Sequence, residues 1–196
     1  RTRNTSWNIE KMNPKSMWNA TAAEFAVSRC VFALDKTNGQ PRWVYGDGQR
    51  AVLNTGIAIS SNTVFLIESR VPAVIADADG SVGLRAFMQT GVVLVALHAG
   101  TGEKRWEQPF AVPARSMLYL SAIRDMLVAS YSYHTGPYAE VFSTDAGAGD
   151  AIKALGEPPK TAQEKARSTL IRFGFLACDA RTGARRWQRE YTSTGV

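Results

Sequence analysis

The sequence predicts an all-β protein made of repeated four-stranded antiparallel units, and three observations predict this class. First, a pattern of Ala, Gly, Arg and Trp at fixed spacing occurs three times, at residues 33–43, 96–106 and 177–187. Second, a short apolar run rich in β-branched and aromatic residues precedes each copy's turn, which is typical of buried strands. Third, two further apolar runs separated by a polar turn follow each of the first two copies. Such internal repetition indicates a repeat architecture.

Each copy of the pattern is predicted to form a β-hairpin. The apolar runs at residues 29–34, 92–97 and 171–177 are the expected first strands. The Asp at the start of the turn accepts hydrogen bonds from backbone amides a few residues later, and the Gly permits a positive φ. The Trp follows four residues after the Gly, so it is placed on the return strand.

A second hairpin is predicted around Asn62 and another around Asp125, nineteen residues after Trp43 and Trp106. The repeating unit is therefore a hairpin, a variable insert and a hairpin. On this basis residues 1–196 are part of one domain, with a half unit at 29–46, a unit at 55–110 with an insert at 69–90, and a unit at 117–191 with an insert at 131–169. Units of this kind are the blades of a β-propeller, of which about two and a half are expected, with short helices in the inserts.

The pattern resembles the tryptophan-docking motif of the PQQ-like propellers, which are also called quinoprotein alcohol dehydrogenase-like propellers. The resemblance implies that each Trp packs between blades, against the Ala of its own motif and the Gly peptide of the neighbouring motif. A buried indole removes roughly 150–250 Å² from water and needs a partner for its N–H, and Ala and Gly leave room for the ring. The residues expected to serve this blade docking are Ala33, Asp35, Gly39, Trp43, Ala96, Gly102, Trp106, Ala177, Asp179, Gly183 and Trp187.

Two and a half blades leave open sheet edges, because propellers close with at least four blades. We therefore expect that the chain is a piece of a longer protein or that other chains supply the missing blades. The absence of an initiator Met at Arg1 favours a fragment or a processed product. The expected partners are accordingly the remaining blades of the same propeller or another protein.

The chain is basic, with 23 Lys and Arg against 17 Asp and Glu, a formal net charge of +6. Arg42, Arg105 and Arg186 precede the three Trp residues and form a row on the other strand face, where they would suit a polyanion-binding module. We favour an ordinary solvated face, because the charges are scattered and aromatic residues do not interleave with the row. These features argue against a nucleic-acid partner. The sequence has no apolar span long enough for a membrane helix and no signal peptide.

The insert at residues 131–169 is the candidate binding region, because variable inserts of repeat proteins collect on one face and often bind ligands. A flexible surface loop is the alternative. The candidate residues are Tyr131, Tyr133, His134, Tyr138, Asp145 and Asp150.

The sequence offers little catalytic chemistry. Two histidines are too few for most metal sites and triads, and His98 replaces the motif Asp, so we expect it to act as a local hydrogen-bond acceptor. Cys30 and Cys178 lie on equivalent strands separated by a whole blade, too far apart for a disulfide. Two free, buried thiols are therefore predicted.

On these grounds the favoured function is a non-catalytic binding or scaffold propeller in an exported bacterial protein, located in the periplasm or at the cell surface by family resemblance. The first alternative is a segment of a PQQ-dependent quinoprotein dehydrogenase. In that case the resemblance implies PQQ and calcium, although no catalytic, cofactor-binding or metal residue can be identified in this sequence. The polyanion-binding module is the second alternative.

Overall fold

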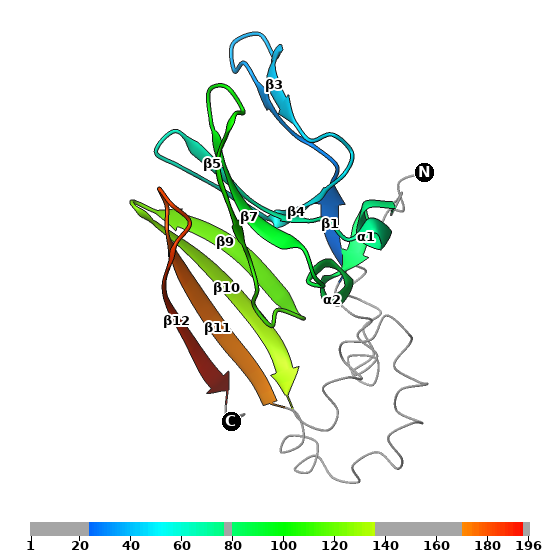
Figure 1. The fold of residues 1–196 in the computed structure, drawn as a ribbon, viewed down its shortest axis with the longest axis vertical. Coiled ribbons are helices and arrows are strands. Elements are labelled where there is room, and N and C mark those ends of the chain that lie inside the picture. Colours follow the sequence, from blue (N-terminus) through cyan, green and yellow to red (C-terminus); the bar gives the residue numbers. More distant parts are fainter. Residues whose placement is uncertain (1–23, 77–79, 136–169, 194–196) are drawn as a thin grey trace, which may run out of the picture.

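The computed structural model describes residues 24–76, 80–135 and 170–193 (Figure 1). The elements in chain order are β1 (Glu24–Ser28), β2 (Val31–Leu34), β3 (Pro41–Tyr45), β4 (Ala51–Ser60), β5 (Thr63–Ser69), α1 (Pro72–Ala76), β6 (Ser81–Gly83), α2 (Leu84–Phe87), β7 (Val92–His98), β8 (Lys104–Pro109), β9 (Met117–Ile123), β10 (Met126–Thr135), β11 (Leu170–Asp179) and β12 (Arg185–Ser193).

These strands form three antiparallel sheets. The hairpin sheet consists of β2 and β3, and the C-terminal sheet has the order β12-β11-β10-β9. The central sheet has the order β6-β1-β4-β5-β7-β8, so β1 and β6 extend the β4 edge of a four-stranded unit. The sequence did not predict this extension, because pairing between segments so far apart leaves no local signal.

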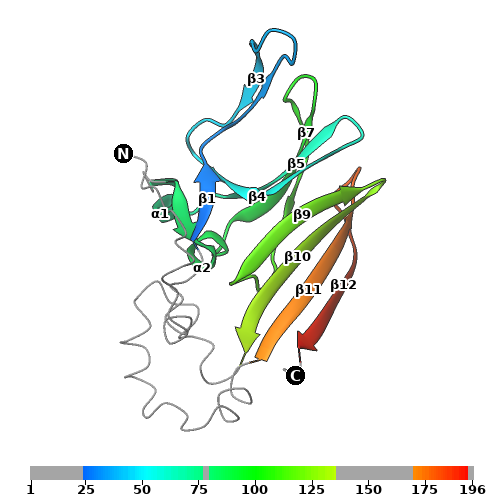
Figure 2. The same ribbon diagram turned by 180° about the vertical axis from the view of Figure 1, so that it is seen from behind.

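The three sheets follow one another with their faces opposed, as the two opposite views show (Figures 1 and 2). Strand β4 of the central sheet contacts β9 of the C-terminal sheet, and the Thr55 hydroxyl donates to the Leu118 carbonyl oxygen at 2.8 Å. Successive four-stranded antiparallel sheets in this arrangement are blades of a β-propeller. The predicted class, an all-β partial propeller with short helices in an insert, is confirmed.

Hairpins join β4 to β5 and β9 to β10, as predicted, and each has a turn of two residues. Ser60 pairs with Thr63 around Ser61 and Asn62, and both turn residues have a positive φ. Ile123 pairs with Met126 around Arg124 and Asp125.

The insert predicted at residues 131–169 has different limits in the structure. Strand β10 continues to Thr135 and β11 begins at Leu170, so Tyr131 and Tyr133 are strand residues and do not belong to an insert. The strand continues because Leu127, Ala129 and Tyr131 repeat at every second position and are all buried. The segment between β5 and β7 holds α1, β6 and α2, and β6 pairs with β1.

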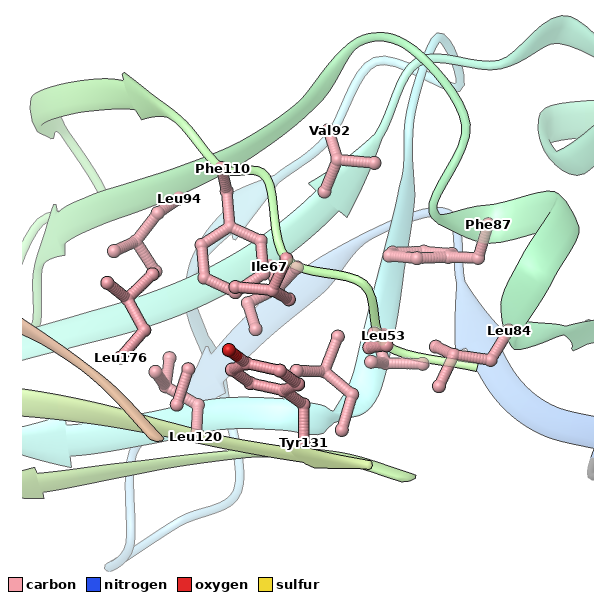
Figure 3. Close-up of a cluster of buried hydrophobic side chains, with 14 of the residues drawn as sticks. Leu53, Ile67, Leu84, Phe87, Val92, Leu94, Phe110, Leu120, Tyr131 and Leu176 are labelled. Carbon is pink, nitrogen blue, oxygen red and sulfur yellow. The ribbon is translucent and has the colours of Figure 1, made fainter. Parts of the chain in front are cut away.

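Strand β5 is buried along its whole length, because a sheet packs on each of its faces. Val64 and Leu66 face a small apolar cluster that includes Trp43 of the hairpin sheet. Phe65 and Ile67 face a larger cluster shared with the C-terminal sheet. Figure 3 shows this larger cluster, with side chains of the central sheet and of β9 to β11 pointing toward one another.

The two cysteines are both free, as predicted, but only Cys178 is buried. The expectation of a buried Cys30 is wrong. The strand begins at Val31, and Cys30 lies in the short connection from β1 to β2, where its side chain is exposed.

Candidate functional site

The three motif copies adopt the same backbone geometry. In each copy the Ala is paired with the Trp across the hairpin, and a register shift follows directly after the Ala. The Gly amide donates to the carbonyl oxygen four residues earlier at 2.8 Å in all three turns. Gly39, Gly102 and Gly183 have φ values of +72°, +74° and +72°, which glycine adopts without strain.

The first polar side chain of each motif accepts hydrogen bonds from its own turn. Asp35 accepts from the Thr37 amide at 2.8 Å, and Asp179 accepts from the Arg181 amide at 2.9 Å. His98 does the same through Nδ1, which lies 3.1 Å from the Thr101 amide. The prediction that His98 replaces the motif carboxylate as a local acceptor is confirmed.

The arginines before each Trp bind polar groups of their own blade. Arg42 pairs with Asp35 at 3.1 Å, and Arg186 contacts Asp179 and also Asp125, each at 2.6 Å. Arg105 has no motif carboxylate and donates to the Thr63 hydroxyl at 2.7 Å.

A hydrogen bond from Arg186 lowers the pKa of Asp179. The Arg186 guanidinium, which donates a hydrogen bond to the carboxylate, is the main cause, and backbone amides of the turn contribute, so that the pKa is about 2. Arg186 likewise lowers the pKa of Asp125. Two of the three arginines in the row are therefore paired with carboxylates.

Trp43 crosses from the hairpin sheet to the turn of the central sheet. Its indole Nε1 donates to the Ala99 carbonyl oxygen at 2.8 Å. A β-carbon placed on Gly102 would lie 2.7 Å from Cδ2 of Trp43, so the ring rests directly on this glycine. The structure brings together the first Trp and the second Gly of the repeat.

Trp106 makes the same contacts one blade later. Its Nε1 donates to the Ala180 carbonyl oxygen at 3.3 Å, and a β-carbon on Gly183 would lie 2.7 Å from Cζ3 of its ring. The ring also packs against Phe65, with 6.0 Å between the ring centroids. Ala99 and Ala180 stand three residues before Gly102 and Gly183, so the two indoles use equivalent carbonyl groups.

Trp187 and Gly39 also belong to the repeated motif, but neither makes this Trp–Gly contact with another described residue. Trp187 has 39 % of its surface exposed. A β-carbon on Gly39 would have no atom within 4 Å, although its turn has the same geometry as the two occupied turns. Within residues 24–76, 80–135 and 170–193, no Trp lies on Gly39 and no Gly lies against Trp187.

The interface between the hairpin sheet and the central sheet, the hairpin interface, contains a buried carboxylate. Glu68 on β5 is completely buried. It accepts a hydrogen bond from the Tyr45 hydroxyl at 3.1 Å, and its other oxygen lies 3.4 Å from Arg50 and 3.2 Å from Arg70. Burial raises the pKa of Tyr45 to about 12, and the Glu68 charge adds to the shift.

Sequence reasoning missed Glu68, although one signal was available. It is a single charged residue at the end of the apolar run Val64–Ile67, and such a residue is seldom fully buried unless it is paired. Each arginine that contacts Glu68 also pairs with a second carboxylate. Arg50 pairs with Asp47 at 2.9 Å, and Arg70 pairs with Glu107 at 2.6 Å. The charges of Glu68, Arg50 and Arg70 are therefore all paired, which suits a structural role for this cluster between the two sheets.

The interface between the central and C-terminal sheets, the C-terminal interface, contains two of the tyrosines singled out in the sequence. The Tyr131 and Tyr133 hydroxyls donate to the two carboxylate oxygens of Glu190, at 2.8 and 3.0 Å. Tyr131 is completely buried and lies across Gly174, where a β-carbon would overlap its ring. Burial is the main cause that raises the pKa of Tyr131 to about 12, and hydrogen bonding to Tyr131 is the main cause that lowers the pKa of Glu190.

The other candidates of the predicted insert are not part of this arrangement. His134 lies in β10, and Tyr138, Asp145 and Asp150 are outside the described residues. Within residues 24–76, 80–135 and 170–193, no three His, Cys, Asp or Glu side chains are grouped in a way that could hold a metal ion.

No helix among the described residues is long and apolar enough to span a membrane.

Strands, turns and opposed sheets define the described chain as part of a β-propeller. No protein-family model and no curated protein matches it. Among solved structures, it is similar to quinohemoprotein alcohol dehydrogenase from Comamonas testosteroni, at 14 % identity and a TM-score of 0.41, over 92 % of this chain and 24 % of that one.

Two further structures show a similarity of the same kind. The quinohemoprotein alcohol dehydrogenase ADHIIG from Pseudomonas putida HK5 has 14 % identity and a TM-score of 0.42, over 88 % of this chain and 26 % of that one. BamB from Moraxella catarrhalis has 19 % identity and a TM-score of 0.34, over 87 % of this chain and 45 % of that one. The chain thus spans about a quarter of the length of these dehydrogenases and less than half of BamB.

Proposed function

We propose that this chain is a non-catalytic, PQQ-like propeller module that acts as a binding or scaffold unit, with its motif tryptophans serving as the docking device between blades. The proposal rests on one observation, which is that two motif tryptophans are docked on a neighbouring sheet and the third is not. Trp43 and Trp106 rest on the glycine turns of the next blade, whereas Trp187 and Gly39 offer the two halves of the same contact to a further sheet.

The two outer faces of the described sheets support this proposal. On the C-terminal sheet the exposed side chains include several large apolar ones, and the hairpin sheet has a smaller set. They are Tyr119, Ile123, Ile171, Phe173, Trp187 and Tyr191 on the first face, and Phe32, Leu34 and Val44 on the second. Exposed large apolar side chains on one sheet face are typical of an interaction site, and we propose that further blades, from the same or another chain, cover both faces.

The polyanion-binding alternative is not favoured, because Arg42 and Arg186 are paired with carboxylates. The periplasm or the cell surface is the proposed location, and this proposal rests on the family resemblance alone.

The main alternative function is that of a segment of a quinoprotein dehydrogenase. One experiment distinguishes this alternative from the scaffold function. The protein is melted with and without added PQQ and calcium chloride, and its near-ultraviolet absorbance is recorded after removal of free quinone. A ligand that binds the folded state raises the melting temperature. The scaffold proposal expects no shift and no retained absorbance; a rise in melting temperature with quinone retained on the protein contradicts it.

A second experiment tests the outer faces directly. Sedimentation velocity over a rising concentration series is expected to show reversible association of the chain through its apolar faces. Phe173→Lys should weaken this association, while Arg181→Lys, an exposed control on the neighbouring turn, should leave it unchanged. Association that is absent, or that is equal in the two variants, contradicts a docking role for this face.

A further inference from the structure

A cavity of about 340 Å³ lies between α2 and the segment that connects β8 to β9. Two arginines, Arg85 and Arg115, line it together with the apolar side chains of Met88, Val112 and Ala114. Among the described residues, no acidic side chain lines it. The cavity therefore combines positive charge with an apolar wall, and none of the residues discussed as docking elements takes part in it.

Arg115 has an unsatisfied donor at this cavity. Among the described side chains, its Nη1 is the buried nitrogen or oxygen that has no hydrogen-bond partner. A buried donor without a partner costs free energy, and the cost is larger for a charged group. Such a group in a native structure indicates a missing partner.

The backbone of Arg115 is firmly held. The amides of Arg115 and Ser116 both donate to the Ser132 carbonyl oxygen at 3.0 Å, and Ser132 is buried in β10. The base of the side chain is therefore fixed on the C-terminal sheet, and the guanidinium is presented from a rigid element. Rigid presentation reduces the entropy cost of binding a ligand.

We propose that this cavity binds a small organic carboxylate, with Arg115 as its principal ligand and Arg85 as a second positive charge. A guanidinium matches the planar geometry of a carboxylate through two parallel hydrogen bonds. The apolar wall formed by Met88 and Val112 suits the hydrocarbon part of such a ligand, since small-molecule sites combine apolar walls with a few polar groups. This inference goes beyond the proposed scaffold function and does not depend on it.

The test uses sodium benzoate as the carboxylate and inorganic phosphate as the comparison anion, at constant ionic strength, with binding to the 196-residue protein followed by calorimetry. Benzoate is expected to bind saturably and more tightly than phosphate. Arg115→Gln should weaken benzoate binding about tenfold or more, because it removes charge-assisted hydrogen bonds. Arg85→Gln should weaken it less, and the exposed control Arg181→Gln should leave it unchanged.

Three results would overturn the proposal: no saturable benzoate binding, phosphate binding as tight as benzoate binding, or equal losses in Arg115→Gln and Arg181→Gln. Melting curves without ligand show whether each variant is folded. If Arg115→Gln does not fold, Arg115→Lys and Arg85→Gln replace it. Arg115→Lys keeps the charge but not the planar donor pair, so benzoate affinity should still fall, and an unchanged affinity contradicts the role of Arg115.

Discussion

The hairpin interface and the C-terminal interface use the same docking contact but have different interiors. Trp43 and Trp106 both rest on a glycine turn and donate to the carbonyl group three residues before that glycine. Trp106 packs against the larger apolar cluster, which the central and C-terminal sheets share. Behind Trp43 lies a small apolar cluster and the fully buried Glu68 with its arginine and tyrosine partners.

From this difference we infer that the repeat specifies the docking contact, whereas the residues around it determine how stable each interface is. A buried ion pair is seldom more stabilising than apolar residues of similar volume, because both charges must leave water. Apolar burial adds roughly 25 cal/mol for each Å² removed from water. We therefore expect the C-terminal interface to be the stronger of the two, and the following variants test that expectation.

The largest effect is expected for Trp106→Ala. This substitution removes a half-buried indole from the larger cluster and should lower the free energy of unfolding by about 3–5 kcal/mol. Trp43→Ala should cost about 2–3 kcal/mol, since its cluster is smaller, and Trp187→Ala less than about 1 kcal/mol, since its ring is exposed. Urea unfolding of the 196-residue chain measures all three free energies. Equal losses at the three positions would contradict the expected ranking, in which Trp106 contributes most and Trp187 least.

Gly183→Ala should cost about 3 kcal/mol. The alanine must adopt a positive φ, and its β-carbon would also displace the Trp106 ring. Gly39→Ala is the matched control, because it has the same φ and no neighbour, and should cost only about 1 kcal/mol. A difference between the two variants that persists when Trp106 is replaced by Ala would show that the indole is not responsible.

Glu68→Gln is expected to lower the free energy of unfolding by about 2 kcal/mol. The amide cannot balance the charges of Arg50 and Arg70, although both arginines keep a second carboxylate partner. Glu107→Gln, a half-buried member of the same cluster, should cost about 1 kcal/mol or less. If the chemical denaturation curves of the two variants coincide, the burial of Glu68 has no energetic consequence. That result would contradict the expected energetic difference between the hairpin interface and the C-terminal interface.

The smallest effect is a change in the acid dependence of stability. The pKa of Asp179 is about 2 in the folded protein and near 3.8 when unperturbed, so its contribution is present above the unfolded pKa. That contribution is lost as the pH falls from about 5 to about 2. Asp179→Asn should therefore flatten this part of the stability profile, and Arg186→Gln should have the same effect. Melting temperatures measured across this range provide the test, and a profile unchanged by both variants would contradict the pairing.

Much of the fold was predictable because its signals are local. The hairpin turns and the role of His98 depend on residues within eleven positions of one another, where side-chain chemistry restricts the backbone directly. The same holds for the two-residue turns around Asn62 and Asp125.

The parts that were missed depend on contacts between distant segments. The pairing of β1 with β4 and β6 leaves no periodic trace in the sequence. The repeat pattern places Tyr131 in the insert at residues 131–169, whereas its environment is set by Gly174 and Glu190 on two other strands. Glu68 was overlooked because only the packing of two sheets on β5 makes its position interior.

Hydrogen exchange of the indole N–H groups tests the central claim most directly. The signals can be followed by nitrogen-15 NMR of the 196-residue chain and assigned with single Trp→Phe variants. Because Trp43 and Trp106 donate to the Ala99 and Ala180 carbonyl groups, their N–H groups should exchange slowly, and that of Trp187 should exchange rapidly. Exchange of Trp106 as fast as that of Trp187 would contradict the proposal that these indoles join successive blades.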